Sequence, residues 1–142
     1  MVYKNIKKVN YNDIIRYSNI YEFPNDDKLI NLFYEINGGK PVGFYFYVNI
    51  CGDMQEDSIS TILSFNENDD ENIYEATLSV IENEREIIPI ALDKDGNYIC
   101  YVNDNGDCSI QLYNIEEMEF YDVYAEKNIR YTPDMFFEDL KE

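Results

Sequence analysis

The feature that most constrains the fold is a series of short apolar segments separated by tight turns in the second half of the chain. Residues 87–92, 98–103 and 109–115 are rich in β-branched and aromatic side chains, which favour strands. The stretches between them, 93–97 and 104–107, carry Asp-Gly-Asn and Asn-Gly turn residues. Strands joined by such tight turns pair antiparallel. This half of the chain is therefore predicted to form a meander.

Other segments also show strand patterns. Residues 42–50 alternate apolar and polar side chains with the period of two expected for a half-buried strand, and residues 59–65 and 119–125 give two further candidates. The segment 87–92 contains Pro89, which has no N–H to donate to a ladder. That strand should therefore place the proline at a sheet edge, at its own start or at a bulge.

The clearest helix is predicted over residues 26–36. Asn25 or Asp26 can cap its start, and Asn37-Gly38-Gly39 follows its end, where a helix favours a residue in the left-handed conformation. The residues predicted to face the core are Leu29, Ile30, Leu32, Phe33 and Ile36.

Two more helices are indicated further along. One follows the wholly polar loop 66–72 and runs to about residue 81, while the other begins after Thr132 as cap, with Pro133 in its first turn. The first twenty residues fit either a short helix or strands. The predicted inward residues are Ile73, Ala76, Val80 and Ile81 in the first helix and Met135, Phe136 and Leu140 in the second.

Together these elements predict an α+β fold. The 142 residues have the length of one domain and contain no Pro/Gly/Ser-rich linker or internal repeat. We expect a single domain over residues 1–142, in which an antiparallel β-sheet of about five to six strands is flanked by helices.

The charge excludes several classes of partner. The chain has 29 acidic and 11 basic side chains, for a formal net charge of -18, and most of the excess lies after residue 40. Such a field repels phosphates, so neither nucleic acid nor an anionic membrane is expected as a partner. The chain also lacks an apolar stretch of about 20 residues and a signal-peptide pattern after Met1. We therefore expect a cytoplasmic protein.

Histidine is absent, which excludes Ser-His and Cys-His nucleophile pairs and all His-containing zinc sites. The cysteines, Cys51, Cys100 and Cys108, form no CxxC pair. If Asn105 and Gly106 form the centre of a two-residue hairpin turn, Asn103 faces Cys108 across the hairpin. Cys100 then points to the other face of the sheet. We expect all three thiols to be reduced, with no metal and no cofactor.

Acidic motifs do not predict catalysis. Residues 93–97 resemble the start of a calcium loop, but Tyr98 stands where the glycine is required and Asp104 where the bidentate glutamate belongs. The carboxylate clusters at 69–71 and 116–119 are expected to be solvated surface. No catalytic residue is predicted.

Tyrosine is unusually frequent, with 14 residues. Tyr45 and Tyr47 lie on the face of their strand opposite Phe44 and Phe46. Either a second layer covers these two tyrosines or they form part of a binding surface.

Two segments carry a family resemblance: 32–41, which ends in Asn-Gly-Gly-Lys-Pro, and 88–100, which begins Ile-Pro-Ile-Ala-Leu-Asp and continues through Gly-Asn. The chain resembles the SUKH superfamily in these motifs and in the order of its elements. The resemblance implies a non-catalytic α+β domain that binds proteins. Bacterial members are typically immunity proteins against polymorphic or contact-dependent toxins, often nucleases, and other members are regulatory scaffolds. The scaffold residues implied by the resemblance are Gly38, Gly39, Pro41, Pro89, Asp93, Gly96 and Asn97.

The leading hypothesis is an immunity protein that binds a basic cognate toxin domain stoichiometrically through acidic and tyrosine side chains. The alternatives are a regulatory scaffold for a host protein and, more remotely, an enzyme that uses carboxylates and a metal. No oligomeric state is predicted. The candidate contact residues are Tyr45, Tyr47, Asp53, Glu56, Asp57, Glu67, Asp69, Asp70 and Glu71.

Overall fold

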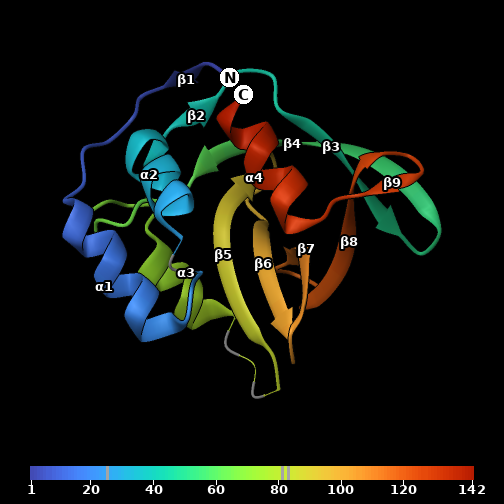
Figure 1. The fold of residues 1–142 in the computed structure, drawn as a ribbon. Coiled ribbons are helices and arrows are strands. Elements are labelled where there is room, and N and C mark those ends of the chain that lie inside the picture. The colour runs from blue at the N-terminus through green and yellow to red at the C-terminus, as the bar shows by residue number, and fades with distance from the viewer. Residues whose placement is uncertain (25, 81, 83) are drawn as a thin grey trace.

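A computed structural model describes residues 1–24, 26–80, 82 and 84–142 (Figure 1). In this part of the chain six strands form a closed antiparallel ring in the order β3-β4-β5-β6-β7-β8. Two residue pairs, Tyr47 with Tyr124 and Val48 with Val123, join β8 back to β3. The strands are β1 (Tyr3–Lys4), β2 (Lys40–Pro41), β3 (Tyr45–Ile50), β4 (Asp53–Ile62), β5 (Glu86–Asp93), β6 (Tyr98–Asp104), β7 (Asp107–Asn114), β8 (Glu119–Glu126) and β9 (Ile129–Arg130).

The ring confirms the mixed α+β class but corrects the expected arrangement of the sheet, which is barrel-like rather than an open sheet flanked by helices. It closes because two long strands change partners along their length. In β4, residues 53–58 pair with β3 and residues 59–62 with β5. In β8, residues 119–122 pair with β7 and residues 123–124 with β3. Strands that pass from one partner to another form the corners at which a sheet folds over.

Pro89 lies at a bulge, which is one of the three positions that the sequence allows, the other two being a sheet edge and the start of a strand. It lies within β5, and the pairing register of β5 with β6 shifts between Pro89 and Ala91. A bulge leaves one residue out of the ladder, which is how a strand flanked by partners on both sides accommodates a proline.

Four helices are described, and the caps of three of them agree with the sequence. The side chain of Asp26 accepts from the N–H of Lys28, and Asn72 and Thr132 cap their helices in the same way. The predicted cap alternative Asn25 and the predicted core residue Ile81 lie outside the described residues. The helices are α1 (Tyr11–Tyr21), α2 (Asp27–Ile36), α3 (Ile73–Ser79) and α4 (Pro133–Lys141).

The helices pack on the ring and share a core with it. Figure 1 shows α4 crossing in front of β5, β6 and β7, with α2 beside it. Phe136 of α4 is fully buried and meets Phe44, before β3, at 5.6 Å between ring centroids. A smaller cluster lies on the other face of the sheet and contains Val80, Ile87, Cys100, Val102 and Tyr113.

Two predicted inward residues are instead exposed. Val42 is 51% exposed and lies before β3, which begins at Tyr45. Met135 is 38% exposed, because the buried stripe of α4 passes through Phe136 and Leu140.

The hairpin between β6 and β7 forms as expected. Asn105 and Gly106 both have positive φ angles, as a two-residue turn that matches strand twist requires. Asn103 faces Cys108, and Cys100 lies in the smaller cluster on the other face. All three cysteines are free.

Candidate functional site

Tyrosines line the outer face of the corner formed by β3, β4 and β8. The ladder places Glu56, Tyr47 and Tyr124 side by side across three strands, with Arg130 of β9 next in the row. These side chains point outward because their neighbours along each strand, such as Val48 and Val123, point into the core. We call Tyr45, Tyr47, Glu56 and Tyr124 the tyrosine face.

No second layer covers the tyrosine face within the part of the chain that is described. Tyr45 is 63% exposed, and Tyr47 and Tyr124 are half-buried. Of the two alternatives left by the sequence, an accessible surface is therefore the one observed. A concentration of tyrosine on a rigid sheet suits protein contacts, because each ring offers a large amphipathic area at little entropic cost.

The charges around this face are mixed. Glu56 flanks the tyrosines on the β4 side, and Asp53 is exposed at the start of that strand. On the β8 side, the Lys127 ammonium lies 6.0 Å from the centroid of the Tyr47 ring, and Arg130 forms an ion pair with Asp122 at 2.8 Å.

Asp57 differs from the expectation. The sequence predicts a surface contact at this position, but the side chain is only 7% exposed because it pairs across the ladder with Phe46 and shares its inward face. It lies beside Asp93, which is 2% exposed. Burial, together with the hydrogen bond and the charge of Asp93, raises the pKa of Asp57 to about 8.

Asp93 itself organises the turn between β5 and β6. Its Oδ1 accepts from the backbone N–H groups of Asp95 and Asn97, both within 3 Å. This is the local hydrogen bonding by which aspartate stabilises turns. Gly96 takes a positive φ of 84° in the same turn. Residues 93–97 thus form a hairpin turn in which the Asp93 carboxylate is bound to backbone N–H groups.

The corner after α2 has a similar structural role. Gly38 takes a φ of 65°, and a Cβ on Gly39 would lie 2.9 Å from the carbonyl oxygen of Ile36. Only glycine avoids both problems. Pro41 follows in β2, buried opposite Tyr3.

The acidic loop before α3 is far from the tyrosine face. It follows the end of β4, whereas Asp53 and Glu56 lie at the beginning of that ten-residue strand. The carboxylate of Asp69 forms a hydrogen bond within the protein, because it accepts from the Ser64 hydroxyl at 2.6 Å. Glu71 lies 4.0 Å from the Lys40 ammonium. Glu67 and Asp70 are exposed.

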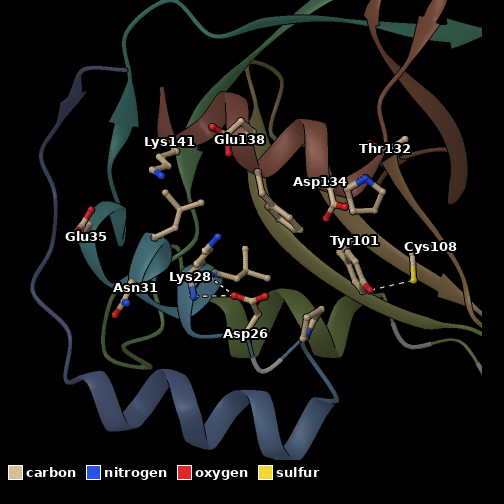
Figure 2. Close-up of a pocket in the computed structure, with 15 residues that line it drawn as sticks. Asp26, Lys28, Asn31, Glu35, Tyr101, Cys108, Thr132, Asp134, Glu138 and Lys141 are labelled. Carbon is tan, nitrogen blue, oxygen red and sulfur yellow. Dashed lines mark hydrogen bonds between the residues drawn. The ribbon is translucent and has the colours of Figure 1, made fainter.

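A groove with a volume of about 710 Å³ lies between α2 and α4, and no pattern in the sequence indicates it. Figure 2 shows Tyr101 and Cys108 at the end where α4 begins, and Glu35 and Lys141 at the opposite end. The Tyr101 hydroxyl donates to the Cys108 sulfur at 3.1 Å. A groove between helices depends on their relative placement, and no local pattern reports it. Its main lining residues are Asp26, Lys28, Leu29, Leu32, Glu35, Tyr101, Cys108, Asp134, Phe137, Glu138 and Lys141.

Comparisons with known proteins do not add to this description. A scan against protein-family models, a search of curated proteins and a search of solved structures found no match. In the described ranges, no helix is both long and apolar enough to cross a membrane, and no three or more His, Cys, Asp or Glu residues gather as metal ligands would.

Proposed function

We propose that this chain is a non-catalytic binding protein of the SUKH type that acts as an immunity protein. It would neutralise a cognate, basic toxin domain in the cytoplasm by stoichiometric contact. The observation that carries the proposal is the tyrosine face, where exposed Tyr45 and half-buried Tyr47 and Tyr124 lie together at a corner of the ring.

The electrostatics support a basic partner. With a formal net charge of -18, the chain attracts a cationic domain over distances of about a Debye length, roughly 8 Å at physiological salt. Complementary fields raise the rate of encounter more than they raise affinity. Fast capture is what an immunity protein needs, because the toxin acts until it is bound.

At the tyrosine face, Tyr45 and Tyr47 would supply the buried anchors of the interface. Tyrosine is enriched among the few residues that carry most of the binding energy in such contacts. Glu56 would face a basic side chain at the rim. The acidic loop lies at the other end of β4, so a partner reaching both regions would have to span the length of that strand.

The test begins with a tagged pull-down from a lysate of the source organism at low salt, with the partner released at high salt and identified by mass spectrometry. The toxin domain found is then co-produced with the chain in a bacterial host. We expect the wild-type chain to restore growth and the Tyr45→Ala/Tyr47→Ala variant to bind at least about tenfold more weakly.

The matched control is Tyr34→Ala, which removes an exposed tyrosine from α2, away from the tyrosine face. It should protect as well as the wild type. Circular dichroism establishes that each variant folds. A chain that binds only housekeeping proteins and gives no protection would contradict the immunity proposal and favour a regulatory scaffold.

A further inference from the structure

The groove between α2 and α4 has a rigid aromatic floor. Phe137 stacks on Tyr101 with ring centroids 6.2 Å apart and an interplanar angle of 28°, and it meets Phe33 edge to face at 5.9 Å. Leu29 and Leu32 of α2 add aliphatic lining. Such a floor favours an apolar side chain, because burial there removes apolar surface from water on both sides.

The rim of the groove carries an excess of negative charge. Four carboxylates, those of Asp26, Glu35, Asp134 and Glu138, face two ammonium groups, those of Lys28 and Lys141. Asp26 is engaged in capping α2. Among the ion pairs of the described residues, none involves the other three carboxylates, so these remain available to a cation from outside.

These two properties together define the ligand chemistry. Lysine and arginine bury their alkyl stems along apolar surface while the charged head stays at a polar rim, and the faces of aromatic rings attract the same cations. The nine residues of α4 extend for about 13 Å at roughly 1.5 Å per residue. That length matches about four residues of an extended peptide.

We propose that this groove is a docking site for a short segment of the basic partner in which apolar residues alternate with arginine or lysine. The apolar side chains lie on Leu29, Leu32 and Phe137, and the cations face Asp134 and Glu138. The inference rests on the proposed function for the identity of the partner. It adds a second contact, on different elements from the tyrosine face.

A peptide probe tests the groove independently of any toxin. The probe is an acetylated, amidated hexapeptide, Ala-Leu-Arg-Leu-Arg-Ala, titrated into the full chain and followed by the backbone amide signals in NMR spectra. We expect saturable shifts concentrated at Leu29, Leu32 and Phe137. A peptide with glycine in place of leucine should bind at least about tenfold more weakly, and so should one with glutamate in place of arginine.

The test variant is Asp134→Asn/Glu138→Gln, which removes two exposed rim carboxylates with little change of shape. Its matched control is Glu84→Gln/Glu116→Gln, which removes two exposed carboxylates elsewhere. The test variant should bind the probe at least about tenfold more weakly, and the control should bind as the wild type does. Equal weakening in both variants, or equal binding of the glycine peptide, would show general attraction to the acidic surface and overturn the proposal.

A second test of the groove uses the toxin partner itself. If the toxin is captured and neutralised but Asp134→Asn/Glu138→Gln changes neither, the groove inference fails while the proposed function stands. If the probe binds the groove but no toxin is found, the proposed function fails while the cationic peptide site stands. A dimer in sedimentation experiments that this variant abolishes would assign the groove to a second copy of the chain and overturn the inference.

Discussion

Asp57 makes the stability of the fold depend on pH. Burial and the neighbouring Asp93 raise its folded-state pKa to about 8, against roughly 3.9 in an unfolded chain. Between these values the folded state holds a proton that the unfolded state releases. The free energy of unfolding therefore falls as pH rises between the two pKa values, by up to about 1.4 kcal/mol per pH unit. Above the pKa of the folded state it falls no further from this group.

Replacing Asp57 with Asn removes this titration and keeps the shape of the side chain. We expect Asp57→Asn to be more stable than the wild type at pH 8, with a difference that shrinks toward pH 4. Urea unfolding from pH 4 to 9 measures it. The control is Asp53→Asn, which makes the same chemical change at an exposed position on the same strand. A constant difference for Asp57→Asn would contradict the prediction.

Asn37 does more than end α2. Its amide nitrogen donates to the Lys7 carbonyl and to the Ser64 hydroxyl, each at 3.0 Å, and its amide oxygen accepts from the Phe65 N–H at 2.8 Å. The side chain is fully buried and joins three separate segments. Removing it leaves the buried Phe65 N–H and the part-buried Lys7 carbonyl without this partner, and an unsatisfied buried group costs about 1 to 3 kcal/mol.

We therefore expect Asn37→Ala to lower the free energy of unfolding by about 2 to 4 kcal/mol. The exposed Asn31 of the same helix provides the control, and Asn31→Ala should change the stability by less than about 0.5 kcal/mol. Urea denaturation followed by circular dichroism measures both. Equal effects at the two positions would show that the three hydrogen bonds contribute little.

At the scale of elements, the start of α4 depends on Thr132. Its hydroxyl accepts from the Met135 N–H at 3.2 Å, so Thr132→Ala should destabilise the protein by about 1 kcal/mol. Hydrogen exchange at the Met135 amide should quicken, while Thr132→Ser should retain most of its protection. If exchange were the same in all three proteins, the cap would not hold the helix end.

Sequence patterns identified helix starts well because a cap is a local interaction. Asp26 and Thr132 cap their helices as expected, and Asn72, the last residue of the polar loop 66–72, caps α3. Strand limits were less accurate, because they depend on the partner. Residues 53–58 carry three acidic side chains and no apolar alternation, yet they form the first six of the ten residues of β4 through their pairing with β3.

At the candidate site, too, local patterns predicted some features, whereas features that depend on strand pairing or packing were not predicted. The alternation of its strand predicted that Tyr45 lies on the face opposite Phe44 and Phe46, but it left open whether a second layer covers that face. The position of Tyr124 beside Tyr47 required the pairing of β3 with β8. The burial of Asp57 likewise follows from its register with Phe46, which no local pattern contains. The α2–α4 groove arises only from the packing of distant elements.

At the scale of the whole molecule, the net charge of -18 predicts how binding responds to salt. The association rate constant with the basic partner should fall at least about tenfold between ~0.05 and ~0.5 M NaCl, while the dissociation rate changes much less. Stopped-flow fluorescence at several salt concentrations measures both. A rate constant of association that salt does not change would contradict electrostatic capture.

The closure of the ring also constrains when the protein can complete its fold during synthesis. β3 receives its second neighbour only when Val123 and Tyr124 are available, more than 70 residues later in the chain. Contacts so distant in sequence form slowly, and a growing chain exposes unpaired strand edges until they do. A ribosome must therefore release the chain at least as far as Tyr124 before the corner that carries Tyr45 and Tyr47 takes its final form.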